Sequence, residues 1–153
     1  MNREIEFRGK LSHSGEWVFG SLLKIDSKYH IANESDMYED GHHICQESDA
    51  PTWVDPDTVG QFTGLVDKNG VKIFEGDIVR KRDLTFGLKF DGVVVYNSEI
   101  GCFRIHSENN GVTMRMGFEA SDVYNDGYCT VPVKYEYEVI GNIYDDVELL
   151  NKK

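Results

Sequence analysis

Cysteine, proline and long apolar runs are all scarce in this chain of 153 residues, which holds only three cysteines and three prolines. Cys45, Cys102 and Cys129 lie far apart and show no Cys-x-x-Cys spacing. They predict reduced thiols rather than a disulfide framework or a four-thiolate zinc site. No apolar run approaches the ~18 residues that cross a bilayer, and the chain does not start like a signal peptide. We therefore expect a cytoplasmic protein without a membrane partner.

Positive charge is also scarce, with 16 Lys and Arg against 27 Asp and Glu, a formal net charge of −11. Unspecific binding to phosphate depends on Lys and Arg, so this balance weighs against nucleic acid and anionic lipid as partners. The densest basic group is Arg80-Lys81-Arg82, which we interpret as a solvated strand end. The alternative hypothesis is a nucleic-acid site, which requires five side chains to converge on one face: Arg80, Lys81, Arg82, Lys89 and Lys134.

Glycine is plentiful, with 15 residues, and apolar and polar residues alternate along many short segments. Such alternation, with turn signals every ~8–12 residues, is typical of an all-β sandwich or small barrel, and we favour a barrel. Composition changes around Pro51, after an irregular acidic stretch at 26–50. We predict an N-terminal β segment at 1–55, packed on a β-barrel domain at 56–153 that ends in a short helical turn.

Three local signals predict where the chain turns. Asp67-Lys68-Asn69-Gly70 predicts a hairpin turn, because glycine readily takes the positive φ of the last loop position. Asp91-Gly92 predicts a tight two-residue turn before the β-branched run that follows it. Asp145 is expected to cap a helical turn near the C-terminus.

The central segment 59–70, VGQFTGLVDKNG, followed by IFEGDIV at 73–79, resembles the signature of the YopX family of phage and prophage proteins. Further agreement lies at 3–9, 20–23, 138–144 and 148–150, so the resemblance covers nearly the whole chain. It implies an all-β protein with an SH3-like small barrel in the central and C-terminal part, and it assigns no catalytic residue. We interpret the signature as structural. The alternative is a binding surface built from Gln61, Thr63, Asp67 and Lys68.

One cluster of soft metal ligands exists, His42-His43-Ile44-Cys45, and an extended strand would place His43 and Cys45 on one side. His30, His13 or Asp40 would have to complete the site, but no spacing demands it. We therefore expect no metal and no cofactor.

Carboxylate pairs are common in so acidic a chain, and none has a partner group that would separate its two pKa values. The pairs are Glu39-Asp40, Asp55 with Asp57, Glu75 with Asp77, and Asp145-Asp146. The sequence also lacks the recognisable nucleotide-binding, hydrolase and metalloprotease motifs. We predict that the protein is not an enzyme, and a metal-dependent enzyme is the least favoured hypothesis.

Aromatic residues are the remaining candidates for a functional surface. Phe103, Tyr135 and Tyr137 can line an exposed strand face, although a barrel core would use them equally well. The leading hypothesis is a noncatalytic module that binds a phage or host protein, or a second copy of itself, through a sheet face or edge. A contiguous exposed aromatic patch would distinguish this hypothesis from the others.

Overall fold

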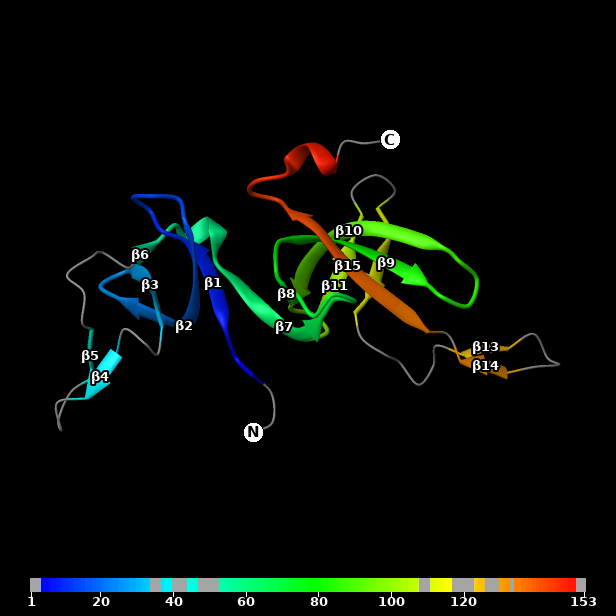
Figure 1. Cartoon of the computed structure of the whole chain (residues 1–153), viewed down its shortest axis with the longest axis horizontal. Coiled ribbons are helices and arrows are strands. Elements are labelled where there is room, and N and C mark those ends of the chain that lie inside the picture. The colour runs from blue at the N-terminus through cyan, green and yellow to red at the C-terminus, as the bar shows by residue number, and fades with distance from the viewer. Residues whose placement is uncertain are drawn as a thin grey trace. The chain divides into compact units, whose positions relative to one another are not determined.

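The structure is a computed structural model. It describes residues 4–33, 37–39, 44–46, 53–107, 111–116, 123–125, 130–132 and 134–150. The chain divides into two compact units, which we call unit 1 (residues 1–64) and unit 2 (65–153). Strands dominate both units (Figure 1), so the all-β prediction is confirmed. The predicted boundary at 55/56 falls inside unit 1, and the packing of one segment on the other stays a prediction.

Unit 1 is built on an antiparallel sheet in which β7 runs on into unit 2. Its elements are β1 (Phe7–Lys10), β2 (Trp17–Ile25), β3 (Lys28–Ala32), β4 (Met37–Glu39), β5 (Ile44–Gln46), β6 (Trp53–Val54), the 3-10 helix η2 (Pro56–Thr58) and β7 (Gly60–Val66). The strand order β6-β3-β2-β1-β7 continues to β8 (Lys72–Phe74), and β4 pairs with β5 in a separate hairpin. Backbone hydrogen bonds of 2.8 Å from Asp55 to Lys10 and 3.1 Å from Ser12 to Trp53 tie β6 to the end of β1.

The prediction of an irregular segment at 26–50 is wrong for Lys28–Ala32, which form β3. Asp26 and Ser27 take positive φ values of 48° and 69°, and they join β2 to β3 where Ile25 pairs with Lys28. Both central positions of such a tight hairpin turn need positive φ, which is usually supplied by glycine or asparagine. This turn contains neither glycine nor asparagine, so the sequence pattern did not reveal it.

The core of unit 1 lies on the inner face of this sheet. Ile31 and Val54 are buried there, next to Gly9 of β1. A Cβ at Gly9 would lie only 3.0 Å from the Cβ of Val54, so glycine allows β1 to approach β6 closely.

Unit 2 contains a five-stranded antiparallel sheet with the order β12-β11-β10-β9-β15. Its strands are β9 (Asp77–Asp83), β10 (Lys89–Asn97), β11 (Cys102–His106), β12 (Thr113–Arg115) and β15 (Tyr135–Asn142). The hairpin β13 (Val123–Asn125) and β14 (Thr130–Pro132) and the 3-10 helix η3 (Val147–Leu149) complete the unit. Among the described strands no pairing joins β12 to β15, so the ladder is open and does not close into a barrel.

The core of unit 2 packs against one face of this sheet. Its buried cluster consists of Ile73, Val79, Val94 and Ile105. Successive side chains of a strand point to opposite faces, so the other face of the sheet carries Arg80 and Arg82 of β9 and Lys89 and Asp91 of β10, beside the buried Ile78 and Val93.

The predicted tight turn at Asp91-Gly92 is wrong, because both residues lie inside β10, where Gly92 pairs with Val79. A Cβ at Gly92 would lie 2.5 Å from the carbonyl oxygen of His106. Glycine is therefore needed for the close approach of β11, not for a turn. The chain turns earlier, between β9 and β10, where Gly87 has a φ of +73°.

The predicted turn at Asp67–Gly70 is confirmed, with a φ of +83° at Gly70. Asp67 is buried, and its Oδ1 accepts hydrogen bonds from the backbone N–H of Asn69 at 2.7 Å and of Val71 at 3.0 Å. Its Oδ2 accepts one from Val139 at 3.2 Å, which joins the turn to β15. Burial by itself would raise the pKa of Asp67, but the hydrogen bonds outweigh it and hold the pKa below its ordinary value.

The short helical turn at the C-terminus is present as η3, but its predicted cap is wrong. Asp146, not Asp145, occupies the N-cap position, and it makes no side-chain capping bond. Its Oδ2 accepts a hydrogen bond from the backbone N–H of Asn142 at 3.0 Å instead. The Oδ2 of Asp145 accepts one from Nδ2 of Asn142 at 3.1 Å. Both carboxylates therefore fix the end of β15.

Candidate functional site

The five basic residues proposed as a nucleic-acid site converge only in part. Arg80 and Arg82 alternate with Lys81 along β9, so they point to the polar face of the sheet, where Arg82 pairs with Lys89 of β10. Lys81 points to the opposite face. It is buried, and its Nζ lies 3.7 Å from the centroid of the Tyr135 ring.

On this polar face Arg80 is paired with a carboxylate. Arg80 donates from Nε and Nη2 to the two carboxylate oxygens of Asp91, at 2.8 and 2.7 Å. This hydrogen bonding raises the pKa of Arg80. Glu138 pairs with Arg80 across the strands, and its Oε1 lies 3.0 Å from Nζ of Lys68. The ion pair of Arg80 reduces the positive charge that this face offers to a phosphate backbone.

The candidate aromatic residues serve the core rather than a surface. Phe103 and Tyr137 pack against the buried cluster of unit 2. Phe103 also meets Tyr96 edge to face, with ring centroids 5.3 Å apart. Together with the position of Tyr135 under Lys81, these contacts favour the core interpretation of the three residues.

The surface proposed from the signature has two residues in each unit. Asp67 is buried by the turn that it organises, and Lys68 forms the ion pair with Glu138. Gln61 and Thr63 lie on β7 in unit 1, where Gln61 pairs with Phe7 of β1. The described contacts of Asp67 and Lys68 therefore support a structural role for this part of the signature.

The proposed metal cluster falls mostly outside the described residues. His42, His43 and Asp40 lie in segments that the structure does not describe, and Cys45 lies on β5. Of the other suggested ligands, His13 is exposed and His30 pairs with Trp53 between β3 and β6. Over the described ranges, no three His, Cys, Asp or Glu side chains gather as metal ligands would. The expectation for residues 40–45 stays a prediction.

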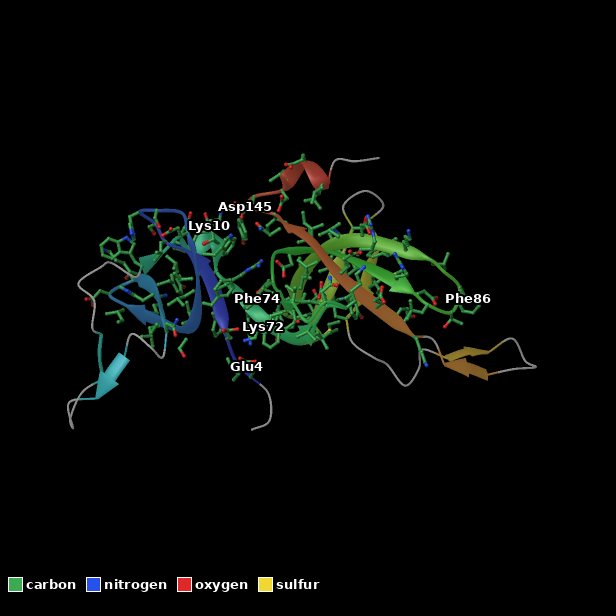
Figure 2. All side chains as sticks on the ribbon, viewed as in Figure 1. Glu4, Lys10, Lys72, Phe74, Phe86 and Asp145 are labelled. Atoms are coloured by element: carbon green, nitrogen blue, oxygen red, sulfur yellow. The ribbon has the colours of Figure 1, made fainter. Side chains whose placement is uncertain are left out.

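A different surface stands out at the turn between β9 and β10, which we call the hairpin tip (residues 84–88). It presents three large apolar side chains to solvent: Leu84 is 52% exposed, Phe86 50% and Leu88 68%. Figure 2 shows Phe86 at the far end of the β9–β10 hairpin. Three exposed large apolar side chains within one loop of five residues favour a binding surface.

The backbone of the hairpin tip is fixed by hydrogen bonds. Oδ1 of Asp83 accepts from the N–H groups of Thr85 at 2.7 Å and Phe86 at 3.0 Å. The carbonyl of Asp83 accepts from Gly87 at 2.9 Å, and that of Lys134 accepts from Leu84 at 2.8 Å. A loop that is already ordered loses little conformational entropy when it binds a partner.

The sequence pattern did not identify the hairpin tip as a loop. The spacing of Leu84, Phe86 and Leu88 is the alternation expected of a half-buried strand. Two signals for a loop were available: Asp83, whose side chain can bond nearby backbone N–H groups, and Gly87.

The fold and signature define a class of two-unit, all-β protein that carries the signature turn at the start of unit 2. A family model described as "YopX protein" matches residues 6–151. The chain therefore belongs to the YopX family, and the resemblance seen in the sequence is confirmed.

A solved structure, described as the crystal structure of protein EF1440 from Enterococcus faecalis, is similar over nearly its full length. It is 25% identical, the match covers 97% of this chain and 99% of that chain, and the TM-score is 0.57. No match was found among curated proteins. Among the described residues, no helix has the length and apolar character needed to cross a membrane.

Proposed function

We propose that this chain is a noncatalytic phage or prophage accessory protein that binds another protein of the phage or its bacterial host through the hairpin tip. It acts in the cytoplasm of the host cell. Membership of the YopX family supports the phage setting. The observation that carries the binding role is the exposure of Leu84, Phe86 and Leu88 on a loop with a fixed backbone.

The hairpin tip is suited to be an anchor within a larger interface. Fully burying a large apolar side chain stabilises a complex by about 1.5–3 kcal/mol. Leu84 and Phe86 are about half buried and Leu88 about one third, so docking gains about 1 kcal/mol from each, or about 3 kcal/mol together. A few such side chains commonly dominate an interface, while their neighbours exclude water.

We also propose that unit 2 has an SH3-like arrangement. Hydrogen bonds joining the β7–β8 turn to the five-stranded sheet support it: Lys68 N–H donates to the carbonyl of Tyr137 at 2.9 Å, and Val139 N–H to Asp67. After β8, Gly76 N–H donates to the carbonyl of Val94 at 2.9 Å. Loops that project from a scaffold of this kind commonly carry binding residues.

The test is affinity capture with the tagged full chain from host cells carrying the induced prophage, with nuclease-treated samples in parallel. The tip variant is Leu84→Ser/Phe86→Ser/Leu88→Ser. The matched control is Val71→Ser/Ile100→Ser, whose residues are each 49% exposed in unit 2. Circular dichroism and thermal melting verify that both variants fold.

We expect one or more specific proteins to be retained by the wild type and the control and lost with the tip variant. Equal retention by the tip variant would refute the role of the tip. Failure of the wild type to retain any specific protein would refute the binding proposal itself. Recovery that disappears after nuclease treatment would favour nucleic acid as the partner.

A further inference from the structure

Unit 1 has a surface cleft of about 340 Å³ along β2. Its lining includes Phe19 and Ser21 of β2, Asn33 after β3, and the residues that precede β1, Glu4, Ile5 and Glu6. Glu4 is labelled at the start of this segment in Figure 2. A cavity of this size lies at the small end of ligand sites, so it can receive one or two side chains rather than an extended peptide.

The sequence builds this cleft through a close approach of β3 to β2. A Cβ at Gly20 would overlap the carbonyl oxygen of Ala32, so the floor of the cleft requires glycine. Phe19 and Ile5, next to this floor, are 44% and 53% exposed. The cleft therefore presents apolar surface in a position that a protruding side chain can reach.

The chemistry of the cleft complements that of the hairpin tip. The cleft combines apolar surface with the carboxylates of Glu4 and Glu6. The tip combines apolar side chains with two exposed lysines: Lys89 follows Leu88 directly, and the backbone of Lys134 bonds to Leu84. Matching apolar groups and opposite charges on two surfaces favour both docking and the choice of partner.

We propose that the hairpin tip of one copy docks in the cleft of a second copy, with Phe86 against Phe19 and the two lysines near Glu4 and Glu6. This inference rests on the proposed function, because it names one partner for the same tip. The contact joins two different surfaces, so it is heterologous and extends from copy to copy. A hairpin tip in a small cleft buries less area than a standard interface, so the association is weak and reversible.

The first test is sedimentation velocity of the full chain over a range of concentrations. We expect the mean mass of the wild type to rise with concentration. Phe86→Asp removes the anchor, and Ser21→Trp fills the cleft at an exposed position without changing a charge. Each is expected to weaken association by about tenfold or more. Ile100→Asp, a matched exposed position, is expected to behave like the wild type.

Mixing the two variants tests directly whether the tip of one chain binds the cleft of another. The Phe86→Asp chain keeps an intact cleft, and the Ser21→Trp chain keeps an intact tip. An equal mixture is expected to form pairs and nothing larger, although each variant alone stays monomeric. A mixture that stays monomeric would overturn the proposal, and so would association of Ser21→Trp alone at the wild-type level.

A charge exchange tests the same contact independently. Lys89→Glu/Lys134→Glu is expected to weaken self-association, and adding Glu4→Lys/Glu6→Lys in the same chain is expected to restore it. Absence of restoration in a folded chain would contradict the assigned pairing. If the wild type is monomeric at every concentration but tip-dependent capture persists, this inference fails while the proposed function stands. If tip-dependent capture is absent but the mixture still pairs, the proposed phage or host partner fails instead.

Discussion

Replacing Asp67 by asparagine is a direct test of how the signature turn stabilises unit 2. The carboxylate accepts four hydrogen bonds, from the backbone N–H groups of Asn69, Val71 and Val139 and from Nδ2 of Asn69. An asparagine can keep its oxygen towards only one pair of donors. Its NH₂ group then faces the other pair, which is Val139 N–H and Asn69 Nδ2 if the turn keeps its shape.

The expected loss follows from the bonds that disappear. A hydrogen bond to a charged acceptor is worth about 1.5 kcal/mol net at the low end, and a weaker one about 1 kcal/mol. Asp67 is 6% exposed, so water does not readily replace the lost partners. We expect Asp67→Asn to lower the free energy of unfolding by about 2–3 kcal/mol at neutral pH. The assay is urea unfolding followed by far-UV circular dichroism.

The effect depends on pH with a definite sign. The hydrogen bonds hold the pKa of Asp67 below its ordinary value of 3.8 in the folded chain. The carboxylate therefore stabilises the fold above that value, and this contribution is lost as the pH falls through the lower, folded pKa. The difference between the wild type and Asp67→Asn should be full at pH 7 and shrink only at strongly acidic pH.

Asp91→Asn is the matched control for this experiment. It removes the partner of Arg80 from an ion pair whose side chains are 35% and 45% exposed. Such surface pairs contribute about 1 kcal/mol or less. Equal losses for Asp67→Asn and Asp91→Asn, or a loss at Asp67 that persists unchanged in strong acid, would refute the assigned role of Asp67.

Two further predictions concern the turn before β9 and the basic residues. Gly76 has a φ of +83°, and a Cβ there would lie 3.0 Å from a ring carbon of Tyr144, so Gly76→Val should cost about 2 kcal/mol or more in thermal unfolding. If Gly76→Val melts at the same temperature as the wild type, the positive φ of Gly76 is contradicted. Because Arg80 is paired and Lys81 is buried, we expect no salt-sensitive mobility shift with DNA or RNA at low salt. A shift abolished by reversing Arg82, Lys89 and Lys134 would restore the nucleic-acid hypothesis.

Signals confined to a few neighbouring residues predicted the fold well. The alternation at 17–25 matches β2, and the turn at Asp67–Gly70 forms where its sequence indicates. Both depend on local preferences, namely side-chain periodicity and the positive φ of glycine. Lys28–Ala32 were missed because Asp26 and Ser27 adopt positive φ without glycine.

The errors arose where distant residues decide the outcome. Gly92 reads as a turn residue in sequence, yet its role is set by the carbonyl of His106 on another strand. Likewise, the alternation of Leu84, Phe86 and Leu88 does not distinguish a strand from a loop. The backbone bond to Lys134, far along the chain, fixes that loop with its apolar side chains in solvent. Local patterns carry no information about such contacts.

Site-specific photocrosslinking in host cells shows whether the hairpin tip contacts a protein partner. A photoreactive side chain replaces Phe86 in one chain and Ile100, which is similarly exposed, in another. We expect a discrete crosslinked protein from position 86, whether a phage protein, a host protein or a second copy, and none from position 100. Crosslinks that are absent at position 86, or the same from both positions, would contradict the proposed contact.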